Sequence, residues 1–323
     1  MRIFILAIDG VFDTGLSVTL DAFSTASRLS AKLFDGTPRF DVTTVGVRRT
    51  VHTSQGLTVP VQSIKPASRP DWVIVPAVLA GTPDELFARL ERADMRDAKS
   101  QLLKWSARGT LIGAACMGTF ILAETGLLDL QKSTTTWSLA PFFRRRFPYV
   151  QLDESRMVVP CTIGVTAGSA MGHLDLALWI IRQASPELAD TVSCYLTADL
   201  RSSQAPFIIP NHLAQADPMI LRFERWARLN LKDGFSLQAA SKALATSART
   251  LQRRCHAVLG KSPLDYFQDL RVEHAQSLLH RDSYDIEAIA TAVGYADGAT
   301  LRALLRDRLG RGVREIRAGF SMN

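Results

Sequence analysis

The sequence holds few cysteines, and their spacing gives them no shared structural role. Four cysteines are scattered among 323 residues, at Cys116, Cys161, Cys194 and Cys255. Such spacing fits neither a set of metal ligands nor a disulfide framework. We therefore expect no metal site, assign no other cofactor, and take a reducing cytoplasm as the compartment.

Long apolar runs are also missing. No uninterrupted apolar stretch reaches the roughly 18 residues that a membrane-crossing helix needs. The amino-terminal run IFILAI stops at Asp9, so it lacks the length and the cleavage context of a signal peptide. These absences exclude an integral membrane protein and predict a cytoplasmic protein with no membrane partner.

What the sequence does contain is typical of soluble globular domains, with 47% hydrophobic and 21% charged residues. Its length allows two or three domains. The net charge of +7 is unevenly distributed, because residues 221–323 hold 17 Lys and Arg against 11 Asp and Glu, a net charge of +6. This excess is expected of a part that neutralises phosphates, although a merely basic surface would give the same count.

The same basic part contains a repeat. Residues 251–260 read LQRRCHAVLG, and fifty positions later residues 301–310 read LRALLRDRLG. Upstream the match continues with a slip of one residue, so that Leu237 pairs with Ile286. Each copy predicts a short apolar helix, a tight turn and an arginine-bearing helix that ends at glycine. This order is typical of a helix-turn-helix, here present twice.

In the first copy, Ser236 is predicted to cap a helix that ends near Leu244, and Ser247 to cap a recognition helix over residues 248–258. Leu251, Val258 and Leu259 would then face the core. An outer face of Arg, Gln and Thr can enter a major groove, where Arg recognises guanine and Gln recognises adenine. The DNA contacts that we predict here are Ser247, Arg249, Thr250, Gln252 and Arg253.

In the second copy, Asp285 is predicted to cap a helix over residues 286–293, and Asp297 to cap a recognition helix over residues 298–309. Gly298 and Ala299 offer no side-chain hydrogen bonds, so we expect weaker base recognition in this copy. The predicted DNA contacts are Thr300, Arg302 and Arg306.

These residues resemble the DNA-binding domain of the AraC-type transcription regulators. The resemblance covers about residues 235–320 and rests on SARTLQRRCHAVLGKSPLDYFQDLRVEHA followed by IEAIATAVGYADGATLRALLRDRLG. It implies two helix-turn-helix units, joined by a helix over about residues 263–280, that bind adjacent major-groove segments about one DNA turn apart. The sequence departs from the family at core or cap positions, namely Cys255, Leu301, Leu305 and Val313.

Upstream of residue 185, short apolar runs alternate with helical patterns. Strands are predicted over residues 2–8, 40–47, 71–75 and 110–115, and helices over residues 17–33, 83–107, 117–124 and 168–183. This alternation predicts a parallel sheet covered by helices on both faces, an α/β sandwich with flavodoxin-like layering.

The pattern fails between residues 202 and 218, where Pro206, Pro210 and Pro218 interrupt it. We interpret residues 202–218 as a linker. It would join an α/β domain of residues 1–201 to an all-α double helix-turn-helix domain of residues 219–323.

Cys116 stands where a predicted strand meets a predicted helix. The strand over residues 111–115 runs directly into Cys116, and Gly113 and Gly118 leave room for a sharp turn. A thiol near a helix N-terminus is expected to have a lowered pKa and to be able to act as a nucleophile.

This arrangement resembles the nucleophile elbow of the PfpI-like, class I glutamine amidotransferase-like superfamily, over about residues 2–182. Together with the AraC-type domain, it is similar to the GlxA-type regulators. Met117 stands where the superfamily's enzymes often have histidine, and in TTTW Thr136 takes the place of another histidine. The family's acidic position aligns near Gly15. We therefore assign no catalytic residue, and our ligand-binding candidates are Asp13, Cys116, Met117, Thr136 and His173.

The two resemblances together imply a transcription regulator whose first domain is a catalytically inactive sensor. The implied partners are promoter DNA, RNA polymerase, a second copy of the chain and a small effector, nitrogen-containing or amino-acid-like. Two alternatives stay open: a cysteine-dependent amidase or hydrolase fused to a DNA-binding module, and a redox sensor acting through Cys116. In the plainest interpretation, Cys116 is a small apolar residue in an inherited turn.

Overall fold

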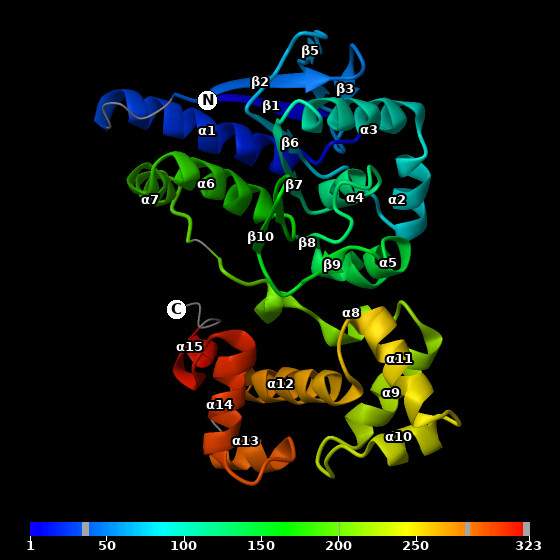
Figure 1. Ribbon diagram of the computed structural model, residues 1–323. Coiled ribbons are helices and arrows are strands. Elements are labelled where there is room, and N and C mark those ends of the chain that lie inside the picture. The colour runs from blue at the N-terminus through cyan, green and yellow to red at the C-terminus, as the bar shows by residue number, and fades with distance from the viewer. Residues whose placement is uncertain (34–38, 200, 282–284, 319–323) are drawn as a thin grey trace. The chain divides into compact units, whose positions relative to one another are not determined.

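The computed structural model describes residues 1–33, 39–199, 201–281 and 285–318. The chain divides into two compact units, shown in Figure 1. Unit 1 comprises Met1–Leu139 and Phe147–Gln204, and unit 2 comprises Ala140–Arg146 and Ala205–Asn323. Residues 319–323, at the end of the predicted DNA-binding domain, lie outside the described residues.

Unit 1 is built on a seven-stranded sheet. Its strands are β1 (Arg2–Ala7), β2 (Asp41–Gly46), β5 (Gln62–Ser63), β6 (Trp72–Val75), β7 (Leu111–Ala115), β10 (Val158–Cys161) and β11 (Gly164–Ala167). Their order across the sheet is β10-β11-β7-β6-β1-β2-β5. Two short pairs lie outside it: β3 (Val51–His52) with β4 (Thr58–Val59), and β8 (Lys132–Ser133) with β9 (Gln151–Leu152).

Most neighbouring strands of this sheet are parallel, but β10 and β11 are antiparallel. The predicted parallel sheet is therefore confirmed for the other six strands, and β10 is an antiparallel strand at one edge. The reason is local, because Thr162 and Ile163 return the chain directly as a hairpin, and a two-residue connection can join antiparallel strands only.

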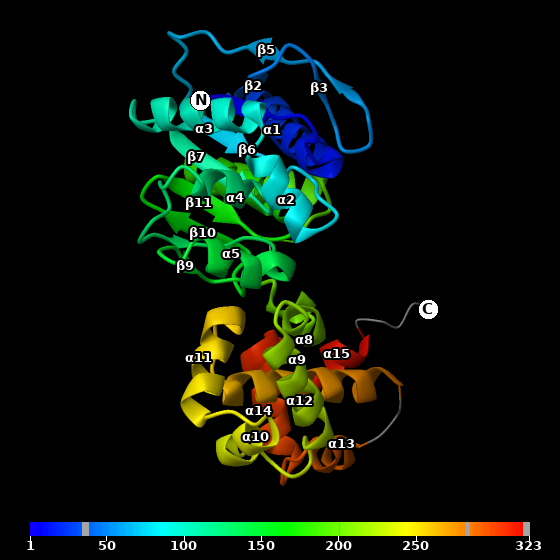
Figure 2. The ribbon, with the colours of Figure 1, turned by 90° about the vertical axis from the view of Figure 1, so that its right-hand side faces the viewer.

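Helices cover both faces of the sheet, as Figures 1 and 2 show. One layer contains α1 (Asp13–Leu33), α6 (Gly172–Ala184) and α7 (Pro186–Tyr195), and the other contains α2 (Pro83–Leu90), α3 (Ala93–Ser106) and α4 (Gly118–Ala123). Because the central strands are covered twice, all four residues of β6 are buried. The predicted α/β layering is confirmed.

Three helices of unit 1 differ from the prediction, and the first of them, α1, begins at Asp13 and not at residue 17. The helix expected over residues 83–107 is divided, because Arg92 is extended with φ −66° and ψ 155°. This break lets both Leu90 and Met95 reach the core, where they are 0% and 1% exposed. The helix expected from residue 168 begins at Gly172, because Ser169 has φ +59°, a left-handed conformation that a helix cannot contain.

Unit 2 is helical. Its helices are α5 (Ala140–Arg146), α8 (Pro210–Ala214), α9 (Pro218–Leu229), α10 (Leu237–Ala243), α11 (Ala248–Leu259), α12 (Pro263–Arg281), α13 (Ile286–Ala292), α14 (Gly298–Leu309) and α15 (Val313–Ala318). The first predicted helix-turn-helix is α10 with α11, the second is α13 with α14, and α12 joins them (Figure 1). The segment interpreted as a linker includes α8, whose Leu213 and Ala214 are buried.

The helix caps mostly follow the sequence. Ser236, Ser247 and Asp297 each accept a hydrogen bond from a backbone N–H of the first turn, as predicted. Asp285 precedes α13 in an extended conformation but makes no capping hydrogen bond, so that prediction is wrong. The Asp285 side chain is exposed, and water can satisfy both it and the first N–H groups of α13.

Arg271 fixes α12 against other parts of unit 2. It is 8% exposed and donates from Nε and Nη2 to the Leu231 carbonyl, at 3.0 and 2.7 Å. Its guanidinium also lies 4.8 Å from the centroid of the Tyr295 ring, in the turn between α13 and α14. One buried cation thus connects the turn after α9 to the turn of the second copy.

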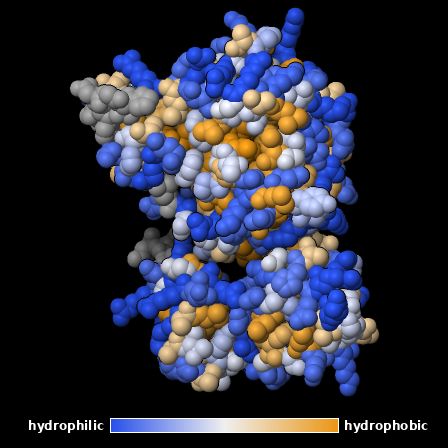
Figure 3. Space-filling view, in the orientation of Figure 1, coloured by the Kyte–Doolittle hydropathy of each residue, from blue (hydrophilic) through white to orange (hydrophobic). Residues whose placement is uncertain are grey.

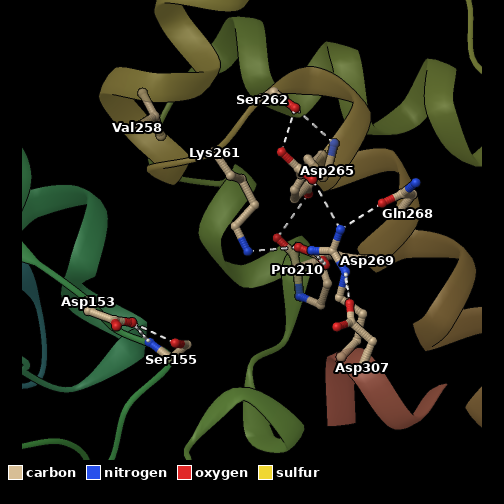
Figure 4. Close-up of polar contacts among 12 residues, drawn as sticks. Asp153, Ser155, Pro210, Val258, Lys261, Ser262, Asp265, Gln268, Asp269 and Asp307 are labelled. Carbon is tan, nitrogen blue, oxygen red and sulfur yellow. Dashed lines mark hydrogen bonds and ion pairs between the residues drawn. The ribbon is translucent and has the colours of Figure 1, made fainter. Parts of the chain in front are cut away.

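A second cation joins α12 to α14. Arg308, near the end of α14, donates to Asp265, Gln268 and Asp269 of α12 at 3.1, 2.6 and 3.2 Å. Figure 4 shows these three acceptors side by side, with Lys261 directed at Asp269. Arg308 is therefore occupied inside the unit and is not part of the exposed face of α14.

Most of the molecular face drawn in Figure 3 is hydrophilic. Large hydrophobic side chains that are more than half exposed include Leu130, Tyr149, Tyr195 and Leu229. Among the described helices, none combines the length and the apolar character that a membrane span requires.

Candidate functional sites

The first candidate site is the turn at Cys116, which we call the thiol elbow (residues 115–118). Cys116 has φ +55°, a strained conformation for a residue that has a Cβ. Its N–H donates to the Ala167 carbonyl at 2.8 Å, and its own carbonyl accepts from Thr135 Oγ1 at 2.7 Å. Gly118 permits the sharp turn, because a Cβ there would lie 2.2 Å from the Val75 carbonyl oxygen.

Burial dominates the chemistry of the thiol. Desolvation raises the pKa of Cys116 to about 11, although hydrogen bonds with the Met117 backbone and the Thr136 side chain act in the opposite direction. The expectation of a lowered pKa is therefore wrong. Helix α4 has only six residues, and its weak dipole does not compensate for the loss of water. At neutral pH the thiol is protonated, and a protonated thiol is a poor nucleophile.

His173 is fully buried, and both of its ring nitrogens are engaged. Nε2 accepts from the Ala77 N–H at 3.0 Å, which leaves Nδ1 to donate to the Ala170 carbonyl at 2.6 Å. Burial lowers the pKa of His173 to about 4, so the ring is neutral near pH 7. Gly15 makes room for it, since a Cβ at that position would lie 2.6 Å from Nε2. Neither nitrogen is free to take a proton from Cys116.

Asp13 begins α1 and holds a neighbouring loop. Its Oδ2 accepts from Ser54 Oγ at 2.6 Å and from the Gln55 N–H at 3.1 Å. Burial by itself would raise the pKa of Asp13, but hydrogen bonds from Ser54, Thr53 and Gln55 outweigh it and the pKa is lowered. The carboxylate is ionised and fixes the turn between β3 and β4.

The structure thus brings Cys116, Met117 and Thr136 together and gives Asp13 and His173 partners of their own. All five lie in segments near the carboxyl ends of β1, β7 and β11 or in the loop after β8, the edge where ligands bind in parallel sheets. In the described ranges, no group of three or more His, Cys, Asp or Glu side chains is placed to hold a metal ion.

Sequence reasoning missed one residue beside this site. Gln204 is fully buried and hydrogen-bonds to the loop that carries Thr134 and Thr135. A single glutamine in a segment rich in serine and proline gives no recognisable pattern. Gly168 is a weak local signal, because a Cβ there would lie 2.1 Å from Gln204 Nε2.

The second candidate site is the outer face of the two recognition helices. In α11, Arg249, Gln252 and Arg253 are exposed, whereas Leu251 and Leu259 are fully buried. Ser247 and Thr250 stabilise the start of this helix, with 2.8 Å between their hydroxyl oxygens. The face predicted from the sequence is therefore solvent-accessible. Arg254, which was not assigned to it, donates from Nε to Asp217 at 2.6 Å.

In α14, Thr300, Arg302 and Arg306 are also exposed, but carboxylates surround the start of the helix. Asp297 accepts from the Thr300 N–H at 2.7 Å and from its hydroxyl at 3.1 Å. Glu287 accepts from the Gly298 N–H at 2.7 Å, and its other oxygen lies 4.0 Å from Arg302 Nη1. The second face is thus less basic at its leading end than the first.

Comparison with known proteins identifies both units. The DJ-1/PfpI family model matches residues 1–183, and a helix-turn-helix domain model matches residues 240–319. The chain is 29% identical over 227 residues to the transcriptional regulator ArgR of Pseudomonas aeruginosa, covering 67% of each protein. It is 28% identical over 211 residues to the transcriptional regulator GlxA of Rhizobium meliloti, covering 64% of this chain and 65% of that protein.

These alignments span about two thirds of the length of the curated relatives. Among solved structures, a protein of Vibrio parahaemolyticus with a proposed role in transcriptional regulation superposes with a TM-score of 0.51 at 18% identity. The superposition covers 61% of this chain and 98% of that one, and at this identity it supports the fold alone.

Proposed function

We propose that this chain, which belongs to the DJ-1/PfpI family and is an AraC-family transcriptional regulator, binds promoter DNA under the control of a small effector held by unit 1. The observation that carries the proposal is the exposed face of α11. Arg249, Gln252 and Arg253 project from one side of a capped helix whose opposite side is buried. Arg and Gln are the side chains that recognise guanine and adenine in the major groove.

The thiol elbow is proposed as the effector site and not as a catalytic centre. Nucleophilic catalysis needs a thiolate and a base within hydrogen-bonding reach of it. Here the Cys116 thiol is protonated at neutral pH, and both His173 nitrogens are engaged with backbone groups. What remains is a small, hydroxyl-bearing environment at Cys116, Met117 and Thr136, which suits recognition of a polar metabolite such as an amino-acid-like amine.

Control would operate by a shift of populations. An effector that binds one arrangement of the chain more tightly than another favours that arrangement in proportion to the difference in affinity. The proposal requires no chemical step. The raised pKa of Cys116 also disfavours a redox role, because oxidation proceeds through the thiolate.

The test uses the full chain. The wild-type protein is first used to select a DNA duplex from a random library. The affinity of the protein for this duplex is then measured by fluorescence anisotropy in the presence of each of the twenty amino acids and of simple amines. We expect one of these compounds to change the DNA affinity of the wild type and to lose that effect in Thr136→Val. A protein that selects no sequence from the library would contradict the DNA-binding part of the proposal.

Two further outcomes would favour the rival functions. Ester or amide hydrolysis that disappears in Cys116→Ser would make unit 1 an enzyme. Peroxide that changes the DNA affinity of the wild type but not of Cys116→Ser would make it a redox sensor. We expect neither result.

A further inference from the structure

Gln204 is the last residue of unit 1, and its carboxamide is buried completely. Its Nε2 lies 3.1 Å from Thr134 Oγ1, 2.9 Å from the Thr135 carbonyl and 3.2 Å from the Arg156 carbonyl. Its Oε1 accepts from Ser169 Oγ at 2.6 Å. Both ends of the side chain are therefore engaged by unit 1.

Two of the three segments that bond to the Gln204 side chain also bond to the thiol elbow. They are the loop that carries Thr134 and Thr135, and residues 167–169 at the end of β11, and we call them the elbow loops. Thr135 gives its carbonyl to Gln204 and donates its hydroxyl to the Cys116 carbonyl. On the other side, Ser169 donates to Gln204, and two residues earlier the Ala167 carbonyl accepts the Cys116 N–H. The two elbow loops therefore hydrogen-bond to the N–H and the carbonyl of Cys116, and also to the nitrogen and the oxygen of the Gln204 carboxamide.

The fit between Gln204 and the second loop is close. A Cβ at position 168 would lie 2.1 Å from Gln204 Nε2, so only glycine accommodates the side chain there. Ser169 has φ +59°, and in this conformation its hydroxyl donates to Gln204. A non-glycine residue in this conformation is held in place by its surroundings, and the hydrogen bond to Gln204 is part of them.

The backbone on either side of Ser203 is also hydrogen-bonded to the segment that precedes β10. The Gln204 N–H donates to the Ser155 carbonyl at 2.8 Å, and the Met157 N–H donates to the Ser202 carbonyl at 3.2 Å. The Ser203 hydroxyl donates to the Ser155 carbonyl at 2.7 Å. Ser202 and Ser203 reach Met157 and Ser155, and Met157 in turn accepts from the Gly168 N–H at 2.8 Å. Gln204 differs from its two neighbours because its side chain bonds directly to both elbow loops.

We propose that Gln204 is a positioning residue that couples the thiol elbow to the chain segment entering unit 2. A buried carboxamide that loses a partner leaves polar atoms unsatisfied, which is costly. Movement of either elbow loop must therefore move Gln204 or detach it. Thr136 directly follows Thr135, so a ligand that shifts Thr136 also shifts the carbonyl to which Gln204 donates.

The inference rests on the proposed function, because it gives effector binding at the elbow a route to the segment before the DNA-binding unit. It adds a residue to which no pattern in the sequence gives a role. Coupling between two sites is reciprocal. A change in residues 202–204 should therefore alter access to the Cys116 thiol, and modification of the thiol should alter residues 202–204.

The forward test measures access to Cys116. The parent protein is the full chain with Cys161→Ser and Cys194→Ser. The rate of Cys116 alkylation by iodoacetamide is measured in this parent and in the parent with Gln204→Ala added. We expect an increase of about tenfold, because loss of buried hydrogen bonds promotes local opening of the elbow. Ser203→Ala is the matched control, because it removes a hydroxyl of the same segment that donates to the Ser155 carbonyl. The alkylation rate of this variant should stay within about twofold of the parent.

The reverse test modifies the thiol and follows the segment. Methyl methanethiosulfonate is added to the same parent protein, and hydrogen exchange is measured at the Gln204 and Met157 amides by mass spectrometry. We expect faster exchange after modification in the parent protein, and no further increase in Gln204→Ala, where exchange is already fast. Thermal melting of each variant shows whether the fold is retained.

Equal alkylation rates in Gln204→Ala and the parent, or equal increases in Ser203→Ala and Gln204→Ala, would overturn the inference. If Gln204→Ala does not fold, Thr135→Val and Ser169→Ala remove one connection each and should raise the alkylation rate in the same direction. The inference stands if thiol and segment are coupled while no compound alters DNA affinity. In that case only the effector proposal fails.

Discussion

In the first helix-turn-helix the recognition helix is capped by Ser247, whereas in the second it is capped by Asp297. In the helix before it, the first copy has Gln238 where the second has Glu287. Two neutral side chains in one copy therefore correspond to two carboxylates in the other. On the recognition helices themselves, Arg249 and Arg253 correspond to Ala299 and Ala303.

One arrangement of two helices thus presents two different charge patterns in the same unit. The first copy has cations and an amide on its exposed face, and we propose that it recognises bases. The second copy keeps its exposed cations, Arg302 and Arg306, farther along the helix and places negative charge at its start. We expect it to contact the DNA backbone and to contribute less to sequence choice.

The largest expected difference between the copies lies in their turns, where Ala245 has φ +50° and Gly294 has φ +85°. A Cβ at 294 would lie 2.4 Å from both the Leu231 carbonyl oxygen and Arg271 Nη2. Gly294→Ala should therefore lower the free energy of unfolding by at least about 2 kcal/mol, whereas Ala245→Gly should raise it by up to about 1 kcal/mol. Urea unfolding followed by circular dichroism measures both. If Gly294→Ala unfolds like the wild type, the two turns are equivalent.

The next test concerns base recognition by the first copy. Arg253→Ala should weaken binding to the selected duplex by about 1–3 kcal/mol if Arg253 contacts a base edge. The loss should be much smaller on DNA of unrelated sequence. Arg225→Ala removes the same charge from an exposed position of α9 and serves as the control. A binding curve for Arg253→Ala within error of the wild type would remove this residue from the proposed contacts.

A smaller effect is expected for Arg302→Ala in the second copy. This guanidinium already lies near Glu287, so part of its charge is neutralised before DNA arrives. We expect a loss below about 1 kcal/mol that is equal on all sequences, and a salt dependence reduced by about one unit of slope. Titrations at several salt concentrations measure it. An unchanged slope would argue against a phosphate contact.

The smallest effect should come from making the second copy resemble the first. Glu287→Gln and Asp297→Ser introduce the residues that the first copy has at the matching positions. A carboxylate about 8 Å from a phosphate in water is repelled by about 0.5 kcal/mol, so each change should strengthen binding roughly twofold. Serine remains a good cap, so stability should change little. Asp84→Asn changes an exposed position of unit 1 and controls for the change in net charge. If Glu287→Gln and Asp297→Ser both bind DNA more weakly, the two carboxylates assist DNA binding.

Local features of this protein could be predicted from the sequence, because local chemistry determines them. Ser247 and Asp297 cap their helices as predicted, since a cap depends on residues three positions apart. The pKa of Cys116 was predicted in the wrong direction, because its desolvation depends on distant segments packed around it. Gln204 lies 69 residues from Thr135 along the chain, and no periodicity or spacing relates the two. The paired contacts of His173 are hidden for the same reason.

The contact between Gly15 and His173 limits how this domain can change by mutation. A carboxylate-bearing side chain introduced at position 15 would collide with the imidazole ring, whose Nε2 lies 2.6 Å from the place of its Cβ. Replacing His173 first would leave the Ala77 N–H and the Ala170 carbonyl without their partner. We therefore expect each substitution to lower the free energy of unfolding when it is made alone. A carboxylate at position 15 requires a change at His173 as well, so the two positions are constrained to change together.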